Sequence, residues 1–449
     1  MKFITYIPAT LCMLLILAGC KDDSASNPTF DDDEIPAIYM DWAAEFVYSL
    51  GDVMTFEAQV SPSDHTTCRW LIDGNVVAEG LRIEHTIDTE EPFTLRFEAE
   101  RNGIKNFRTA EVSIALEFVA KEYNKVVVGM LPKNGSSGQV QWDHITHLMF
   151  TSLTVENETG SLTMPEGSEL RQLNTLIPLA HNNGVQVIID ISGPMNFPML
   201  YGGYGDHSFN NVVIDPDKRK ILIGEIAAFA EEYDLDGVNI SITNINNDDG
   251  GLISTDQIAV FMNELGEVLP TEVDEGRRKF YFTATVPHNY QFSQYAYLSQ
   301  VERLDWVNFL PMGVTDLAPT PHAPDYLIHE HLGLFANSEL GSTRAVVGIG
   351  AFGIRYDLPE GVEITWGNLD NYLSYPSYAD ILRMDTNAAE KDELSLGSGL
   401  FYTGREGALR KTDIALDYNA AGMLIWMMNY DTSDADKSLT QSVYNHMNP

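Results

Sequence analysis

The feature that most constrains the fold of this chain is a regular alternation of short apolar runs with segments of helical length after residue 123. Segments 216–232, 254–269 and 295–303 are predicted to form amphipathic helices between the runs. The runs are rich in β-branched residues, and we predict eight strands from them, at 125–130, 147–153, 186–191, 237–242, 280–286, 306–310, 345–349 and 423–427. Eight strand–helix units over about 325 residues predict a (β/α)8 barrel, whose functional residues lie at the carboxyl ends of the strands.

The region from 36 to 118 has a different pattern. Residues 53–60 and 93–99 alternate between apolar and polar with a period of two, and turn residues occur at Asp73-Gly74-Asn75 and Asn102-Gly103. About 80 residues of short strands predict a β-sandwich that precedes the barrel. Cys68 is expected in its core beside Trp70. Within the barrel, the segment 357–420 is too long for a plain connection and is expected to contain an inserted small subdomain.

The first residues have the organisation of a secretory signal. Lys2 precedes an apolar run over 3–17, which small residues follow. A short membrane anchor is the alternative, but the run falls short of the ~20 apolar residues that span a bilayer. We therefore predict a signal peptide over 1–19 and an acidic linker over 20–35.

Composition excludes several classes of function. The net charge of −38 opposes binding to nucleic acid, because phosphate backbones are repelled by such a surface. Three cysteines are too few for a disulfide scaffold or a multi-cysteine zinc site. The histidines show no helical metal-binding spacing next to acidic residues, and His329 and His331 are expected on a helix or loop. No metal or cofactor is predicted.

Residues 17–20, Leu-Ala-Gly-Cys, resemble a bacterial lipobox, which implies acylation of Cys20 and attachment to the membrane through lipid alone. The following Lys21-Asp22-Asp23 resembles the export signal of surface lipoproteins, which implies an outer-membrane, cell-surface location. Segments 50–56 and 68–74 resemble polycystic-kidney-disease (PKD) domains, which are immunoglobulin-like spacers. Trp70 matches their strand tryptophan, for which we expect a packing role.

The barrel resembles family 18 glycoside hydrolases, which include chitinases and endo-β-N-acetylglucosaminidases. The stretch 233–243 is similar to the strand-four motif of the family, Asp-Gly-x-Asp-x-Asp-x-Glu. Five further segments are similar to other strands of the family in the same order, at 146–150, 190–193, 304–310, 347–353 and 421–426. The resemblance covers essentially all of 123–449.

The resemblance also implies a loss of catalytic groups. In active members, the final Glu of the motif protonates the leaving oxygen, the preceding Asp orients the N-acetyl group of the substrate, and a strand-six Tyr contacts that group. Here these positions are Thr243, Ser241 and Met312, and the Asp before Ser241 is Asn239. Only Asp236 matches, with an expected structural role. General acid catalysis alone contributes ~10²–10⁴-fold in rate, and threonine cannot supply it.

Other residues are candidates for sugar binding. Trp426 matches the tryptophan beneath the bound sugar in active members, and Phe150 is a second candidate for the floor of the site; packing of the barrel is the alternative role of both. Tyr201 and Tyr204 are predicted in a loop after strand three, and aromatic residues at 366, 372, 375 and 378 in loops after strand seven. Asp190 occupies the position of a family serine.

These features predict a non-catalytic surface lipoprotein that binds N-acetylglucosamine-containing oligosaccharides, chitin-like or N-glycan, and presents them to neighbouring glycan enzymes or a transporter. One alternative is an active chitinase or endo-β-N-acetylglucosaminidase with relocated carboxylates, for which Asp190, Asp316 and Asp431 are the candidates. A second alternative is a protein-binding barrel without a sugar ligand.

Overall fold

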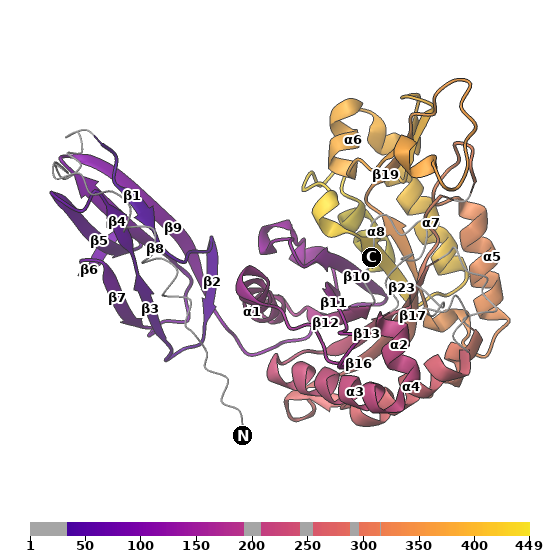
Figure 1. Cartoon of the computed structure of the whole chain (residues 1–449), viewed down its shortest axis with the longest axis horizontal. Helices are drawn as coiled ribbons and strands as arrows, with labels where there is room; N and C mark the ends of the chain where they lie inside the picture. The colour runs from indigo at the N-terminus through magenta and orange to yellow at the C-terminus, as the bar shows by residue number, and fades with distance from the viewer. Residues whose placement is uncertain (1–33, 193–207, 243–254, 288–295, 315) are drawn as a thin grey trace, which may run out of the picture. The chain divides into compact units, whose positions relative to one another are not determined.

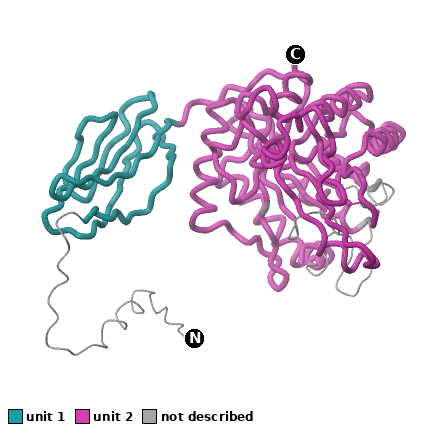
Figure 2. Tube along the Cα trace, turned by 90° about the horizontal axis from the view of Figure 1, so that it is seen from above, with its two compact units in different colours: residues 1–114 teal, residues 115–449 magenta. Residues whose placement is uncertain are grey.

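The computed structural model describes residues 34–192, 208–242, 255–287, 296–314 and 316–449. The chain divides into two compact units, Met1–Ile114 and Ala115–Pro449 (Figure 2). Among the residues singled out above, Cys20, Tyr201, Tyr204 and Thr243 lie outside the described ranges.

The first unit consists of strands. Two of its hairpins turn where the sequence predicted, at Asp73-Gly74 (φ 47° and 79°) and Asn102-Gly103 (φ 50° and 87°), with the positive φ angles typical of two-residue hairpin turns. A five-stranded sheet has the order β2-β9-β8-β5-β6, and β1-β4 and β3-β7 form two pairs. The strands are β1 Ala37–Tyr39, β2 Glu45–Tyr48, β3 Val53–Glu57, β4 Gln59–Ser61, β5 Thr66–Ile72, β6 Asn75–Glu79, β7 Arg82–Thr86, β8 Phe93–Arg101 and β9 Ile104–Ile114.

Trp70 lies at the centre of the core of this unit. Its side chain is fully buried, and its ring centroid lies 4.6 Å from that of Phe97. The expected packing role of Trp70 is therefore confirmed. Cys68, two residues earlier on β5, is only half-buried against this core, so its expected place inside the core is wrong. Its partial burial raises the pKa of the thiol.

The second unit is a closed barrel of eight parallel strands in the order of the chain (Figure 1). All eight predicted strands are present, and none of their ends differs from the prediction by more than two residues. The strands are β10 Val126–Pro132, β11 His147–Leu153, β12 Gln186–Ser192, β13 Gly237–Ser241, β16 Tyr281–Pro287, β17 Trp306–Leu310, β18 Ala345–Gly350 and β23 Gly422–Trp426. A hairpin of β14 Glu272–Val273 and β15 Arg278–Lys279 precedes β16.

Helices surround this barrel (Figure 1). They are α1 Gly167–Asn182, α2 Ser208–Ile214, α3 Pro216–Glu232, α4 Thr255–Val268, α5 Asp325–Ala336, α7 Arg405–Asp417 and α8 Leu439–Met447. The predicted start of α3 follows from local chemistry, because Asp215 accepts hydrogen bonds from two backbone N–H groups of the first turn and proline occupies the first helical position. Over the described ranges, no helix is both long and apolar enough to cross a membrane.

The helix predicted over 295–303 is wrong in extent. Its described part contains only a 3-10 helix, Ala296–Gln300. The chain must leave the helical path here, because the N–H of Asp305 already donates to the carbonyl of Phe282 on β16 as β17 begins.

The boundary between the units also differs from the predicted one, since residues after Ile114 bond to the barrel: the N–H of Leu116 donates to Asn182 on α1.

The barrel strands are buried on both faces, and alternate residues along a strand pack in two different environments. On β12, Val187, Ile189 and Ile191 pack in the large apolar cluster that strands and helices share, whereas Ile188 packs in a second cluster with interior residues of other strands. Asp190 and Ser192 share the parity of Ile188, and therefore face the interior. The interior consequently has polar positions that the exterior of the same strand lacks.

An inserted subdomain follows β18, as predicted. Its antiparallel sheet has the order β20-β19-β22-β21, with β19 Gly353–Tyr356, β20 Leu373–Ser374, β21 Glu393–Leu394, β22 Gly399–Tyr402 and helix α6 Tyr378–Met384. The subdomain thus starts earlier than predicted and ends before α7, which belongs to the barrel. Tyr378 is not a loop aromatic: it begins α6, is fully buried, and donates its hydroxyl to the carbonyl of Lys437.

Candidate functional site

A layer of polar side chains lies inside the barrel, on four neighbouring strands. We define the polar layer as Asp190 and Ser192 on β12, Asn239 and Ser241 on β13, Thr283 and Thr285 on β16, and Asn308 on β17. The register places Asp190 beside Asn239 and Ser192 beside Ser241. All seven side chains are buried. Their positions near the carboxyl ends of the strands are where ligands bind in this architecture.

Hydrogen bonds link most of the layer into one network. The amide of Asn239 donates to Asp190 Oδ1 at 2.6 Å, and its carbonyl oxygen accepts from Thr283 at 2.7 Å and from Asn308 Nδ2 at 3.1 Å. Asn308 in turn accepts from the indole N–H of Trp306 at 3.0 Å. Because every group of Asn239 is engaged, its side chain is held in one orientation, as buried polar groups require.

Asp190 is the one ionisable member of the polar layer. Its Oδ1 accepts from Asn239 and, at 2.7 Å, from the hydroxyl of Ser241. Its Oδ2 and the hydroxyl of Ser192 have no hydrogen-bond partner among the described residues. Burial raises the pKa of Asp190 to about 6, and the two hydrogen bonds only partly oppose this effect. The layer therefore contains a carboxyl group that changes charge near neutral pH, and two buried polar atoms without a hydrogen-bond partner among the described residues.

The motif positions on β13 contain no acid in the part that the structure describes. Asn239 and Ser241 are neutral, and the hydroxyl of Ser241 donates its proton to Asp190. Asp236, the position that matches the family, lies at the opposite end of the strand. There it accepts hydrogen bonds from Arg278 at 2.5 Å and from the backbone N–H of Val187 at 2.7 Å. This network fits the structural role predicted for Asp236.

Trp426 ends β23 and faces the interior, in the cluster that also contains Met312. Only 2% of its surface is exposed, and the ring of Phe352 packs edge-on against it, with centroids 5.4 Å apart. The Met312 side chain, at the position of the family tyrosine, is buried as well. His322 packs on the other side of Phe352, and burial lowers its pKa to about 3, so it is neutral. The barrel interior near the carboxyl end of β23 is thus lined by aromatic and apolar side chains, in contrast to the polar layer on β12 to β17.

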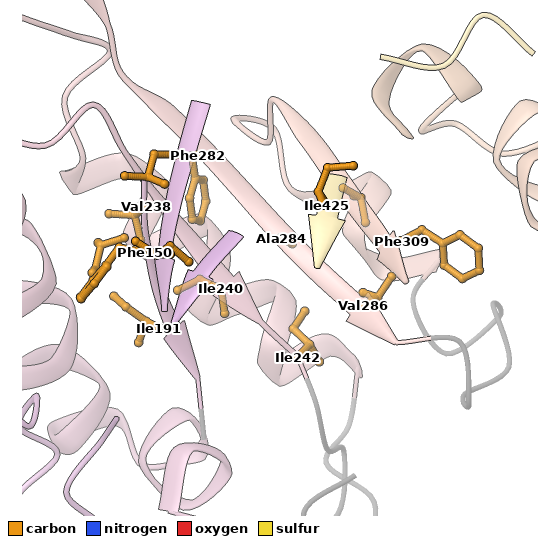
Figure 3. Packing of buried hydrophobic residues seen from close by; sticks show 14 of the residues in the cluster. Phe150, Ile191, Val238, Ile240, Ile242, Phe282, Ala284, Val286, Phe309 and Ile425 are labelled. Atoms are coloured by element: carbon orange, nitrogen blue, oxygen red, sulfur yellow. The ribbon is translucent and has the colours of Figure 1, made fainter. Parts of the chain in front are cut away.

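Phe150 does not face this interior. It packs with Val238 and Ile191 in the cluster between the strands and the helices (Figure 3). The residues that flank it in β11, Met149 and Thr151, have the opposite parity, and Met149 belongs to the interior cluster. The prediction that Phe150 forms part of a sugar-binding floor is therefore wrong, since alternation along the strand points its ring away from the interior.

The structure separates the three candidate relocated carboxylates. Asp431 has a structural role, because its two oxygens accept hydrogen bonds from Gln141, Ser438, Thr440 and backbone N–H groups at the start of α8. Asp316 is exposed on the segment after β17. Asp190 alone of the three lies inside the barrel. The hydrogen bonds of Asp431 thus tie its carboxylate to the start of α8, away from the polar layer.

The sequence analysis did not identify Ser192, Thr285 and Asn308 as members of the polar layer. A usable signal existed for Asn308, because it interrupts the apolar run of β17 at the parity of Trp306. Thr285 similarly interrupts the run of β16. Over the described ranges, no group of three or more His, Cys, Asp or Glu side chains is arranged to hold a metal ion.

Comparisons with known proteins agree with this geometry. The family model described as glycosyl hydrolases family 18 matches residues 126–431, whereas no curated protein sequence gives a significant match. The similar solved structures include a chitinase from Bacteroides thetaiotaomicron (TM-score 0.57, 23% identity, covering 72% of this chain and 96% of that one). They also include the chitinase-like agglutinin RobpsCRA from Robinia pseudoacacia (0.56, 16%, 71% and 99%) and a plant class V chitinase mutant from Cycas revoluta in complex with (GlcNAc)3 (0.55, 17%, 72% and 99%).

At these identities the solved structures establish the shared fold, and the family match covers more than half of the chain. The ordered strands, the closed barrel and the family match lead to one conclusion: this chain belongs to family 18 of the glycosyl hydrolases.

Proposed function

We propose that this protein is a non-catalytic member of its family that binds N-acetylglucosamine-containing oligosaccharides. The observation that carries the proposal is the neutral character of the β13 motif. Asn239 and Ser241 replace two family carboxylates, and both are fixed in hydrogen bonds within the polar layer. Binding requires affinity for the ground state only, so loss of the groups that stabilise the transition state is compatible with it.

The ligand class is supported by the family and by the interior opposite the polar layer. A chitinase of similar fold carries (GlcNAc)3 in its solved structure, and a chitinase-like agglutinin has the same fold. In this chain, Trp426 provides an indole at the carboxyl end of β23, which suits the apolar face of a pyranose ring. Its small exposed area also suits packing of the barrel, so a substitution must distinguish the two roles.

The cellular setting of this proposal comes from the N-terminal sequence. Acylation of Cys20 would anchor the chain to the outer membrane, and the acidic segment 20–35 would act as a tether. The strand-rich first unit would then serve as a PKD-like spacer. Such a protein would present captured glycans to neighbouring enzymes or to a transporter.

The test is a one-dimensional proton NMR time course with the mature chain from residue 21 onward. Mixed with N-acetylglucosamine oligomers or an N-glycan pool, the protein is expected to broaden the sugar resonances without producing new reducing-end anomeric signals over a day. New anomeric signals would establish hydrolysis, and unchanged spectra with both ligands would exclude binding to either.

Trp426→Ala is expected to lower the affinity for the glycan at least tenfold, because stacking against the sugar is lost. Isothermal titration calorimetry measures this change. Trp42→Ala is the matched control, since Trp42 packs against the core of the first unit, outside the barrel. Trp426→Phe, which retains a ring of smaller volume, separates loss of stacking from loss of folding. Unchanged affinity in a folded Trp426→Ala variant would assign this residue to barrel packing.

A second candidate function is hydrolysis that uses Asp190 as the acid. The observation in its favour is the burial of Asp190, which raises the pKa to about 6, a range that suits a general acid. In this case the NMR time course would show new anomeric signals that Asp190→Asn abolishes.

A further inference from the structure

The two unpartnered atoms of the polar layer lie on one strand and on the same side of it. Asp190 Oδ2 and Ser192 Oγ are both buried and lack hydrogen-bond partners among the described residues. They are two residues apart on β12, and Ser192 is the last residue of that strand. A buried polar atom without a partner is costly to the fold, so a pair of them at the ligand-binding end of a barrel points to a missing polar partner.

The two atoms differ in what they can bind. An ionised carboxylate oxygen only accepts hydrogen bonds, whereas a serine hydroxyl can donate one. A planar secondary amide has one N–H donor and one C=O acceptor on opposite edges. A secondary amide therefore matches the chemistry of the two atoms, with one acceptor and one donor on the same side of β12.

We propose that Asp190 and Ser192 recognise the acetamido group of a bound N-acetylhexosamine, with Asp190 Oδ2 accepting from its N–H and Ser192 Oγ donating to its carbonyl oxygen. This inference rests on the proposed function and adds the group that is recognised and the residues that recognise it. It places the contact on β12, and not on the β13 and β17 side, where the family resemblance would place it.

The β13 and β17 side lacks suitable groups in this chain. The hydroxyl of Ser241 donates to Asp190 Oδ1 at 2.7 Å, so its proton is engaged within the polar layer. Met312 replaces the family tyrosine and offers no donor. Asn239 and Ser241 both bond to Oδ1 of Asp190, which orients the carboxylate and leaves its Oδ2 for the ligand.

This arrangement makes binding dependent on pH. The groups that contact Asp190 from β13, Asn239 and Ser241, are neutral. Thr285 and Asn308, which bond to Asn239 from β16 and β17, are neutral as well. His147 on β11 is also neutral at pH 5 and above, because burial lowers its pKa to about 3. The ligand N–H requires the ionised carboxylate, and burial raises the pKa of Asp190 to about 6. Affinity is therefore highest above pH 7 and falls about tenfold by pH 5, where about a tenth of the carboxylates are ionised.

Calorimetric titration of the mature chain with tri-N-acetylchitotriose, with an N-glycan that contains the chitobiose core, and with cellotriose tests the proposal. The wild type is expected to prefer the acetylated ligands at least tenfold over cellotriose. At pH 7.5, Asp190→Asn is expected to lower their affinity tenfold to a hundredfold, and Ser192→Ala about threefold to tenfold. Asp190→Asn also removes the loss of affinity between pH 7.5 and pH 5. Asp417→Asn, which changes an exposed carboxylate at the end of α7, is the matched control and leaves affinity unchanged.

The outcomes separate this inference from the proposed function. If the wild type binds the acetylated ligands and Asp190→Asn binds them equally well, recognition through β12 is wrong while glycan binding stands. Equal affinity for cellotriose and tri-N-acetylchitotriose would overturn acetamido recognition in the same way. A wild type that binds none of the three ligands would overturn both proposals.

Discussion

Asp190→Asn is expected to raise the free energy of unfolding of the barrel by about 3 kcal/mol at pH 8 and to leave it almost unchanged at pH 4. The ordinary pKa of an aspartate is 3.8, and burial raises that of Asp190 to about 6. A difference of about two pKa units corresponds to about 3 kcal/mol.

The direction follows from proton linkage. Below pH 3.8 the carboxyl group is protonated in both the folded and the unfolded chain, and the neutral group is fully accommodated by the fold. As the pH rises through 6, the folded chain must ionise a buried carboxyl group, and the stability that the neutral form contributed is lost. Asparagine does not ionise, so the variant retains this stability at high pH.

Calorimetry of the mature chain at pH 4, 6 and 8, following the transition of the larger unit, measures the difference between the two proteins. Asp417→Asn, which changes an exposed carboxylate at the end of α7, is the control, and its difference from the wild type is expected to be small at all three values. If Asp190→Asn were no more stable than the wild type at pH 8, the carboxylate would have a partner that compensates its burial. A buried charge that lowers stability is typical of residues retained for function.

Asp236→Ala is expected to lower the free energy of unfolding by about 3–5 kcal/mol, because it removes the one fully buried carboxylate that the described residues pair with the buried Arg278. The carboxylate of Asp236 is fully buried and accepts from Arg278, whose side chain is 2% exposed, and from His181 at 2.8 Å. It also accepts from the backbone N–H of Val187 at 2.7 Å, so the substitution leaves a second buried donor unsatisfied.

Asp234→Ala provides the matched control, since Asp234 pairs with the same Arg278 but its side chain is 64% exposed. Its removal is expected to lower stability by no more than about 1 kcal/mol, as is usual for exposed ion pairs. Urea denaturation of both variants at pH 7 gives the comparison. Similar losses in the two variants would mean that burial does not decide the strength of these pairs.

The positions of the strands could be predicted because each barrel strand is a short β-branched run between helical segments. The turns at Asp73-Gly74 and Asn102-Gly103 could be predicted for a similar reason, since few residues accept the positive φ angles that these hairpins require. The neutral residues Asn239 and Ser241 could also be identified from the sequence, because the identity of a residue does not depend on packing. These features are local.

Only the tertiary structure decided which side of each strand faces the interior. Barrel strands are apolar on both faces, so the sequence shows their alternation without showing which parity points inward. The sequence therefore does not show that the ring of Phe150 packs toward the helices and not toward the interior. Asp431 and Asp190 likewise each lie at or after the end of an apolar run, so the sequence does not distinguish their roles. Their hydrogen-bond partners do: Asp431 accepts at the start of α8, whereas Asp190 is buried in the polar layer. The sequence alone determined the strands, the turns and the neutral residues at 239 and 241. Burial and hydrogen-bond partners, which depend on contacts between distant segments, determined what the side chains of the barrel interior can do.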